Sequence, residues 1–348
     1  MEVEERAALI SRNSEEVVEP EQLKHLLETK KDVQGYIGYE PSGFFHIGQG
    51  LITGAKILDL MKAGVKMTVF LADWHAYIND KLGGSMENIR LCAEYLKVCF
   101  KSLGIEEPQA RYLYANDLVK DPDYWQLVLD VGQSSSLNRT KRAITIMGRK
   151  EDEADLATAK LFYPLMQVAD IFHMKMDIAY AGMDQRRAHM LCRDVAPSLK
   201  REKPVALHTP LLPSLLGSGR MEMDAKMSKS KPETAVFFHD PSERVLEKIS
   251  KAFCPPKEVD GNPVIGIAKH ILFPMRAGLE IERPAKFGGD IEFDSYPKLE
   301  QEYRDGKLHP QDLKAAVGRD LETVLAPIRA KIVASSEFKR MAEIVSPP

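Results

Sequence analysis

The sequence predicts an α/β fold, with a parallel sheet that is interrupted by a helical insertion and followed by a mainly helical C-terminal domain. Strand-like and helical segments alternate in the first half of the chain, which is typical of parallel sheets. A long helical stretch at about 120–170 separates the two halves of this pattern, and helical spacing dominates beyond residue 240. With 348 residues, of which 44% are hydrophobic, the chain can build a large core and two domains.

The first predicted strand runs into a glycine-rich turn. An apolar run through Tyr39 ends at the proline, serine and glycine of 41–43, and residues 49–64 then place apolar side chains at helical spacing. His46 and Gly48 therefore fall at a helix N-terminus, where free backbone N–H groups and the helix dipole favour an anion. The turn predicts a phosphate-binding element in which the imidazole donates to an oxygen.

The later elements follow from the same reasoning. In chain order we expect strand 66–72, helix 87–102, strand 110–114, the helical insertion, strand 177–181, a helix near 185–191 and the run 208–216. Another helix is expected to start with Asp240 as its N-cap, Pro241 as its first residue and Glu243 as its third. We therefore divide the chain into two domains, 1–235 and 236–348.

A second phosphate-type element is the segment 226–230, Lys-Met-Ser-Lys-Ser. Two lysines beside small hydroxyls, in a stretch bordered by glycine and proline, can close over a polyphosphate. Lysine and serine runs are also common on solvated surfaces, so the segment alone is a modest signal. The upstream turn makes the pair more specific than either part.

Tyr163, Gln167 and Asp170 are spaced so that a helix places all three on one side. Their neighbours are apolar, which favours burial of this polar face, and buried polar groups need partners. Either a small polar ligand supplies those partners, or the three groups satisfy one another and the backbone. His75 follows a predicted strand end, where ligand-binding residues collect in open α/β sheets, and is either a pocket residue or a core histidine.

Composition argues against several classes of protein. No run of eighteen apolar residues and no apolar leader is present, so we expect a soluble, cytoplasmic protein without a membrane partner. The four cysteines lack the spacing of a zinc site; no metal site is predicted, and we expect buried thiols. Because the net charge is −3 and the pI about 6.3, any RNA contact would use a local basic patch.

The spacing His46-x-Gly48 resembles the HIGH signature and the segment 226–230 resembles the KMSKS signature, which together mark class I aminoacyl-tRNA synthetases. This resemblance implies a Rossmann-like nucleotide-binding domain, with ATP as substrate accompanied by Mg²⁺. It implies that catalysis uses His46, Gly48, Lys226 and Lys229, and that ATP is bound by Gly43, His46, Gly48, Gln49, Lys226, Met227, Ser228, Lys229 and Ser230. Gln49 is a departure, since the family often carries a second histidine there.

Tyr36, the run 163–170 and the run 182–185 resemble the substrate pocket of tyrosyl-tRNA synthetases of the archaeal and eukaryotic type. The resemblance implies that the tyrosine phenol is hydrogen-bonded by Tyr36 and Asp170, and that its amino group and nearby atoms are held by Tyr163, Gln167 and Gln185. It implies a tyrosine–tRNA ligase, which makes tyrosyl-adenylate and pyrophosphate from tyrosine and ATP and then transfers tyrosyl to the 3′-terminal ribose of tRNA(Tyr). Phenylalanine would leave the phenol-binding groups unpaired.

The same resemblance implies RNA contacts and a second subunit. Arg142 and Arg186 match positions that read the first acceptor-stem base pair, while Phe287, His309 and Asp312 lie in segments similar to anticodon-binding ones. The alternatives are solvated surface charge for the arginines, a core role for Phe287 and a helix cap for Asp312. The resemblance also implies a catalytic role for 1–235, an anticodon-binding role for 236–348 and a homodimer through the insertion.

Three other functions remain open. A tryptophanyl-tRNA synthetase shares the fold and both signatures, but it needs a partner for an indole N–H, and Tyr36 with Asp170 favours tyrosine. A small nucleotidyltransferase would share the HIGH-like turn but would not explain the polar helix face. An RNA-binding paralogue that has lost activation is suggested by Gln49, and it would bind tRNA without forming an adenylate.

Overall fold

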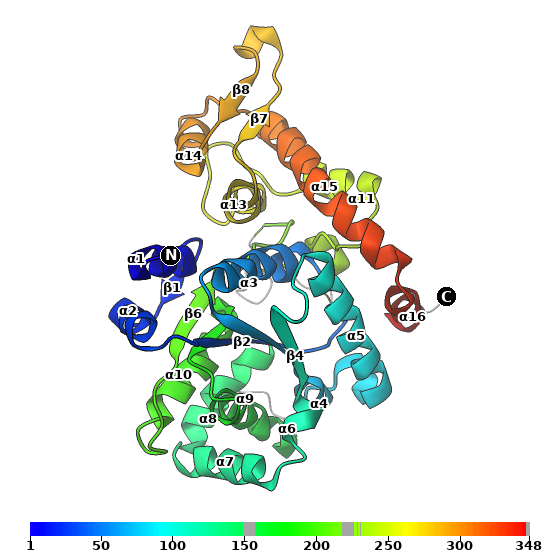
Figure 1. Cartoon of the computed structure of the whole chain (residues 1–348). Helices are drawn as coiled ribbons and strands as arrows, with labels where there is room; N and C mark the ends of the chain where they lie inside the picture. The colour runs from blue at the N-terminus through cyan, green and yellow to red at the C-terminus, as the bar shows by residue number, and fades with distance from the viewer. Residues whose placement is uncertain (149–156, 218–225, 228, 230, 346–348) are drawn as a thin grey trace. The chain divides into compact units, whose positions relative to one another are not determined.

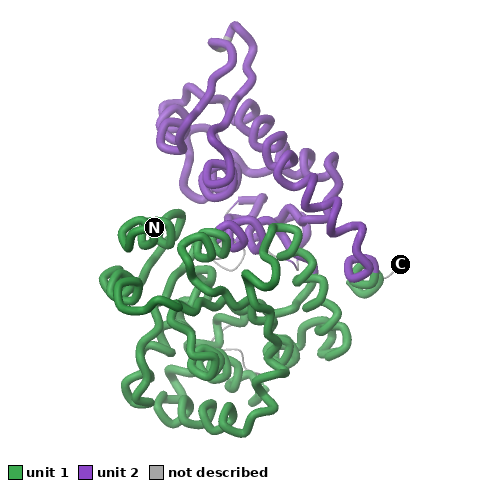
Figure 2. Tube along the Cα trace, in the orientation of Figure 1, with its two compact units in different colours: residues 1–43, 56–210, 340–348 green, residues 44–55, 211–339 purple. Residues whose placement is uncertain are grey.

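A six-stranded sheet is the centre of the first of two units into which the chain divides in the computed structural model (Figures 1 and 2). The structure describes residues 1–148, 157–217, 226, 227, 229 and 231–345. The first unit comprises 1–43, 56–210 and 340–348, and the second comprises 44–55 and 211–339. The predicted division into a catalytic part, 1–235, and an anticodon-binding part, 236–348, concerns function and remains a prediction.

The sheet has the strand order β1-β6-β5-β2-β3-β4. Its strands are β1 (Glu16–Val17), β2 (Gln34–Tyr39), β3 (Lys66–Leu71), β4 (Ala110–Tyr114), β5 (Ile178–Gly182) and β6 (Val205–Thr209). β2 to β6 pair in parallel, which confirms the predicted sheet, whereas the short edge strand β1 runs antiparallel to β6 and was not predicted. From β2 the chain continues to β3 on one side, while β5 lies on the other, so a topological switch point lies between β2 and β5.

The predicted helices of the first unit are present. The helices are α1 (Val3–Ser11), α2 (Pro20–Thr29), α3 (Thr53–Lys62), α4 (Asp73–Ile78), α5 (Met86–Ser102), α6 (Ala115–Leu118), α7 (Pro122–Gln133), α8 (Leu137–Ala143), α9 (Phe162–His173) and α10 (Arg186–Val195). Local chemistry sets several starts: the Ser85 side chain caps α5, and Asp121 caps α7 with Pro122 at its first position. Helices α7, α8 and α9 belong to the predicted insertion, of which residues 149–156 lie outside the described part.

The insertion helices pack on one face of the sheet (Figure 1). Tyr36 of β2 and Phe70 of β3 share a buried cluster with Tyr124 of α7, Met166 of α9 and Leu191 of α10. All five side chains are almost fully buried. This core holds α9, with its polar face, against the middle of the sheet.

The second unit is mainly helical, as predicted, with one small addition. Its helices are α11 (Ser242–Lys251), α12 (Pro263–Ile267), α13 (Phe273–Met275), α14 (Tyr296–Arg304), α15 (Pro310–Ala334) and the start of α16 (Ser336–Val345). A two-stranded antiparallel sheet, β7 (Leu279–Ile281) with β8 (Ile291–Phe293), was not predicted. The strands are three residues each, too short to show a clear alternation in sequence.

The prediction that Asp240 caps α11 is wrong. The helix begins at Ser242 with Pro241 as its N-cap, and no side chain caps it. The Asp240 carboxylate instead accepts hydrogen bonds from the Phe237 backbone N–H, at 2.8 Å, and from Lys248 Nζ, at 2.6 Å. A buried ammonium needs a carboxylate more than a helix start needs a cap, because water satisfies an exposed helix end.

Gly50 is expected to tolerate no side chain. A Cβ at this position would overlap the Phe238 ring. Gly50→Ala should therefore lower the free energy of unfolding by about 1–3 kcal/mol, the usual cost of overpacking, as measured by urea unfolding. Gly132→Ala in α7 is the control, because its Cβ would meet only Leu165, at 3.4 Å. Equal stability of the two variants would contradict the prediction, and Phe238→Leu should partly rescue Gly50→Ala.

Candidate active site

The polar face of α9 lies at the switch point of the sheet. Tyr163, Gln167 and Asp170 are all buried, as the helical spacing predicts. β2 supplies Tyr36, and Gln185 ends the turn that follows β5. The structure thus brings together, within the first unit, the residues that the sequence predicts for a tyrosine pocket.

Hydrogen bonds connect these side chains. Gln167 Nε2 donates to Gln185 Oε1 at 3.4 Å, and Gln185 Nε2 donates to the Ile146 carbonyl at 3.0 Å. Burial raises the pKa of Tyr36 well above its usual value, and the Asp170 carboxylate raises it further. Burial likewise raises the pKa of Tyr163. Both phenols stay protonated at neutral pH; that of Tyr36 can donate a hydrogen bond to a ligand, whereas that of Tyr163 is hydrogen-bonded to the Glu40 carboxylate.

The Asp170 carboxylate lies close to two side chains, those of Tyr124 and His75, to which its position in the sequence does not connect it. Its Oδ1 accepts a hydrogen bond from the Tyr124 hydroxyl at 2.8 Å, and its Oδ2 lies 3.1 Å from Nε2 of His75. The buried His75 ring also meets the Tyr163 ring edge-on at 4.9 Å, so His75 lies beside the predicted pocket residues. Tyr124 was missed, because nothing in the local sequence of α7 connects it to a residue 46 positions later. A carboxylate has about four acceptor positions, so Asp170 retains capacity for a ligand hydroxyl.

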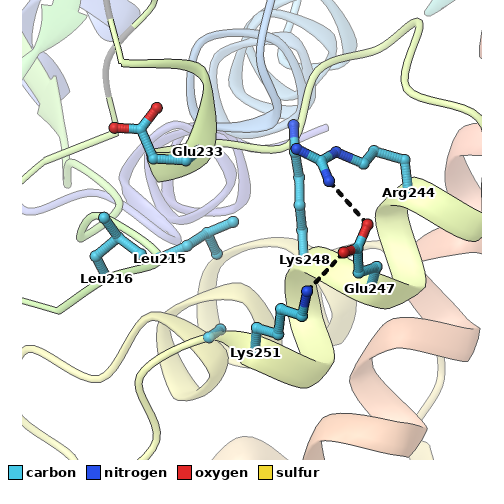
Figure 3. A pocket seen from close by; sticks show the side chains of 8 residues that line it. Leu215, Leu216, Glu233, Arg244, Glu247, Lys248 and Lys251 are labelled. Atoms are coloured by element: carbon cyan, nitrogen blue, oxygen red, sulfur yellow. Dashed lines mark hydrogen bonds and ion pairs between the residues drawn. The ribbon is translucent and has the colours of Figure 1, made fainter.

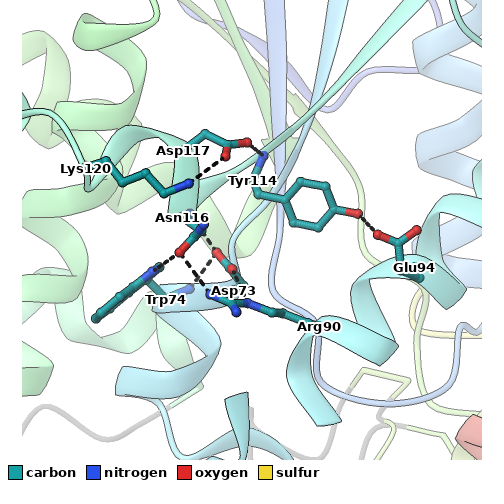
Figure 4. A network of polar contacts seen from close by, with 8 residues as sticks. All are labelled: Asp73, Trp74, Arg90, Glu94, Tyr114, Asn116, Asp117 and Lys120. Carbon is teal, nitrogen blue, oxygen red and sulfur yellow. Dashed lines mark hydrogen bonds and ion pairs between the residues drawn. The ribbon is translucent and has the colours of Figure 1, made fainter. Parts of the chain in front are cut away.

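A polar network at the ends of β3 and β4 holds the helix that carries His75 (Figure 4). The buried Asp73 accepts hydrogen bonds from the backbone N–H groups of Trp74 and Asn116, each at 3.0 Å. The Asn116 side chain in turn accepts from Arg90 at 2.9 Å. Burial raises the pKa of Asp73, against the opposing effect of these donors. The network fixes the start of α4 and thereby the position of His75.

His46 and Gly48 of the predicted phosphate-binding turn lie in the second unit. The backbone N–H groups of Gln49 and Gly50 donate to the His46 carbonyl, and a π-helical turn over Gly48–Ile52 leads into α3. The predicted helix start is confirmed, although its first turn is wider than an α-helix. His46 is 5% exposed, and its Nδ1 has no hydrogen-bond partner among the residues that the structure describes. A buried polar atom of this kind is suited to a ligand.

Burial, with Lys229 and Lys226 nearby, lowers the pKa of His46 to about 3. The imidazole is therefore neutral at physiological pH and offers one N–H donor to an oxygen. The two lysines supply positive charge to the same region. His46 itself adds no positive charge to this region, whereas Lys226 and Lys229 do.

The remaining ATP candidates are placed only in part. Met227 is buried and donates its backbone N–H to the Leu212 carbonyl at 3.1 Å, while Lys226 and Lys229 are half-buried. Ser228 and Ser230 lie outside the described residues. Gly43, in the first unit, has a φ of +125°, a conformation that favours glycine.

Stability is expected to fall as the pH drops from about 7 to about 5, because His46 and His189 are buried and uncharged in the folded chain. Burial lowers both pKa values, that of His46 to about 3. Unfolded histidine titrates near pH 6.5, so unfolding below that pH takes up protons and is favoured by about 1.4 kcal/mol per histidine and pH unit. Urea midpoints should be constant above about pH 7, fall below it, and fall less steeply for His46→Gln. A constant midpoint down to about pH 5 would contradict this.

The segments that carry the two predicted RNA-contacting arginines, Arg142 and Arg186, are neighbours in the structure. Arg187 donates to the Arg142 carbonyl at 3.0 Å, which brings the end of α8 to the start of α10. Arg186 is not a free surface charge: its guanidinium forms two hydrogen bonds with Glu16, at 2.7 and 2.8 Å. If Arg186 contacts RNA, its guanidinium either keeps its hydrogen bonds with Glu16 during the contact or gives them up.

Two of the three C-terminal candidates, His309 and Asp312, lie at the start of α15. His309 is the N-cap of α15, and its Nδ1 accepts from the Gln311 backbone N–H at 3.2 Å. Asp312 is in the first turn of that helix and is not its cap. The Phe287 side chain lies outside the described residues.

Comparison with known proteins agrees with this geometry. Residues 28–326 match the family described as tRNA synthetases class I (W and Y). The tyrosine–tRNA ligase of Aeropyrum pernix is 50% identical over 99% of this chain and 98% of its own length. The crystal structure of tyrosyl-tRNA synthetase complexed with L-tyrosine from Pyrococcus horikoshii is 42% identical, with a TM-score of 0.92 over 99% of this chain and 100% of that one. Tryptophanyl-tRNA synthetase from Aeropyrum pernix is 20% identical with a TM-score of 0.67 over 94% of this chain and 85% of that one, a likeness of fold alone.

Proposed function

The chain belongs to the class I tRNA synthetases (W and Y), and from this premise we propose which of its residues activate tyrosine and contact tRNA. Its activity is that of a tyrosine–tRNA ligase with ATP as a substrate. The observation that carries this function is the 50% identity to a tyrosine–tRNA ligase over 99% of the chain. The similarity to a tyrosine-bound synthetase over the whole chain supports the same conclusion.

Tyr36 and Asp170 bind the phenol of tyrosine in this proposal. Tyr36 stays protonated and donates to the ligand hydroxyl, whereas the Asp170 carboxylate accepts from it. Tyr163, Gln167 and Gln185 hold the amino group and nearby atoms. The burial of Asp170 supports the assignment, because an unfilled acceptor is costly where water is excluded.

The tyrosine carboxylate attacks the α-phosphorus of ATP in line and displaces pyrophosphate, and tyrosyl then passes to the tRNA 3′-terminal ribose. Neutral His46 and the Gly48 backbone contact the phosphates, and Lys226 and Lys229 stabilise the charge that develops on them. Gly43, Gln49, Met227, Ser228 and Ser230 complete the proposed ATP contacts.

Magnesium arrives with ATP in this proposal, as part of the substrate. Among the residues that the structure describes, no group of three or more histidine, cysteine, aspartate or glutamate side chains could hold a metal ion. The ion would therefore be held mainly by the phosphate oxygens and water, as is usual for Mg²⁺ with nucleotides. No residue of the chain is assigned to it.

Arg142 and Arg186 contact the tRNA acceptor end in this proposal, and Phe287, His309 and Asp312 contact the anticodon. The adjacent ends of α8 and α10 support the first assignment, since they place both arginine segments together. The exposed position of His309 at the start of α15 supports the second. The chain would work with tRNA(Tyr) in the cytoplasm, a reducing compartment in which its four buried cysteines stay free thiols. In the part of the chain that is described, no helix has the length and apolarity to span a bilayer.

A homodimer through the insertion is also part of the proposal. Trp125, Leu129 and Leu137 of α7 and α8 are 37%, 60% and 58% exposed, an apolar surface that a second copy would cover. The chain should sediment at twice its mass of 39.1 kDa, and Leu129→Glu with Leu137→Glu should produce monomers. Exposed Leu246→Glu, in the second unit, is the control. A wild-type monomer would refute the dimer.

Exchange of labelled pyrophosphate into ATP tests the activation chemistry directly. Tyrosine, tryptophan and phenylalanine are compared without tRNA. Exchange with tyrosine alone is expected. Exchange with tryptophan alone would remove Asp170 from its role, and no exchange with any of the three would favour an RNA-binding protein without activation.

A further inference from the structure

A short segment, Ala235–Asp240, joins the two proposed ATP elements within the second unit; we call it the strap. It follows the lysine segment in sequence and pairs antiparallel with the turn that carries His46. The Ile47 backbone N–H donates to the Val236 carbonyl at 2.9 Å, and that of Phe238 donates to the Phe45 carbonyl at 3.0 Å. The strap therefore determines where the His46 backbone lies.

One buried ammonium ties the two ends of the strap together. Lys248 of α11 donates to the Ala235 carbonyl at 2.9 Å and to Asp240 Oδ2 at 2.6 Å, and it lies 5.1 Å from the centre of the Phe237 ring. Asp240 Oδ2 also accepts from the Phe237 backbone N–H. The Lys248 side chain is 7% exposed and that of Asp240 10%. A helix outside both signatures thus fixes the segment that pairs with the His46 turn.

The backbone of Asp240 is held from a second direction. Arg329 of α15 donates to the Asp240 carbonyl at 2.9 Å and is itself held by Glu322. The strap is consequently fixed at its start by Lys248 and at its end by both Lys248 and Arg329. Such over-determined geometry is what a phosphate-binding turn requires if it is to stay in place before ATP binds.

We propose that Lys248 and Asp240 are positioning residues for ATP activation, which hold His46 in register with Lys226 and Lys229. The inference rests on the proposed ATP contacts and adds two residues that do not touch the substrate. Removing two charges from water usually costs as much as their attraction gains, so a buried pair is a poor device for stability alone. A pair that also anchors two backbone groups of the strap is better explained by the geometry it fixes.

The same helix supplies a matched control (Figure 3). Lys251 follows Lys248 by one helical turn and pairs with Glu247 at 2.6 Å, but its side chain is 74% exposed. Both lysines line a pocket with Leu215, Leu216 and Glu233, and Figure 3 shows Lys251 turned toward Glu247. Both residues are lysines of α11 that pair with a carboxylate. They differ in burial and in whether they contact the strap.

Lys248→Met and Lys251→Met are compared in tyrosine-dependent pyrophosphate exchange and in equilibrium binding of tyrosine. Lys248→Met should lower kcat by at least about 10-fold, as displacement of phosphate-binding groups does, and leave the tyrosine Kd within about 2-fold, because the proposed tyrosine contacts lie in the first unit. Lys251→Met should change neither. Wild-type kcat in Lys248→Met, or equal losses of kcat and tyrosine affinity, would overturn the positioning role.

Two further variants keep the test decisive. If Lys248→Met fails to fold, Asp240→Asn replaces it, since the amide oxygen still accepts from Phe237 while the charge is lost; a lowered kcat is expected, and an unchanged one overturns the proposal. Lys229→Ala shows whether a failure lies in the proposed ATP contacts or only in the positioning role of Lys248. If Lys229→Ala is slow and Lys248→Met is not, only the positioning role fails. If Lys229→Ala is as fast as wild type, the ATP assignment fails and the positioning role fails with it.

Discussion

Asp170→Ala is expected to lower kcat/KM for tyrosine in pyrophosphate exchange by about 10³-fold or more, mainly through lost tyrosine affinity. The variant removes the proposed acceptor for the ligand phenol and leaves the buried Tyr124 hydroxyl without its partner at 2.8 Å. Discrimination against phenylalanine should collapse with it. Tyrosine-activating enzymes are themselves the standard example of such discrimination, at about 10⁴–10⁵-fold.

A pair of smaller substitutions shows whether the effect is local. Tyr124→Phe removes one hydrogen bond to Asp170 and should raise the tyrosine KM by about 10-fold with a smaller change in kcat. Tyr180→Phe is matched to it: Tyr180 is equally buried in the first unit, but its hydroxyl contacts Thr209 at 3.2 Å. Tyr180→Phe should leave the ratio of tyrosine to phenylalanine activation unchanged. Unchanged tyrosine affinity in Asp170→Ala would remove this carboxylate from the pocket.

Lys229→Ala is expected to slow tyrosine activation by about 10²–10³-fold and to leave the tyrosine Kd nearly unchanged. In the proposed mechanism, the Lys229 charge acts where negative charge develops on the phosphates, and other residues make the tyrosine contacts. The neutral state of His46, whose pKa is about 3, makes the loss larger, because the histidine cannot replace the missing charge.

Stopped-flow or quench measurement of adenylate formation separates the two quantities. Lys231→Ala, an exposed lysine two residues later, is the control and should behave as the wild type. Equal losses in activation rate and tyrosine affinity for Lys229→Ala would refute the role of this segment. Loss of tyrosine affinity with an unchanged activation rate would indicate that Lys229 contacts tyrosine and not ATP.

Features with a local signature could be predicted well. The strand β4, the helix α5 and the polar face of α9 follow from side-chain periodicity, which needs only neighbouring residues. The turn around His46 was predicted because glycine and a helix start determine its backbone. The two-residue edge strand β1 was not predicted, since its pairing with β6 joins segments about 190 residues apart and leaves no pattern in either.

The sequence by itself determined the parallel α/β class, the order of its elements, the two signatures and the residue types that face the proposed tyrosine pocket. Only the tertiary structure decided how those residues are supported: Asp170 by Tyr124 and His75, and Asp240 by Lys248 where the sequence suggested a helix cap. The physical reason is common to both cases. Burial makes an unpaired charge or hydroxyl costly, so the partner is chosen by proximity in the folded core, and proximity there is independent of spacing along the chain.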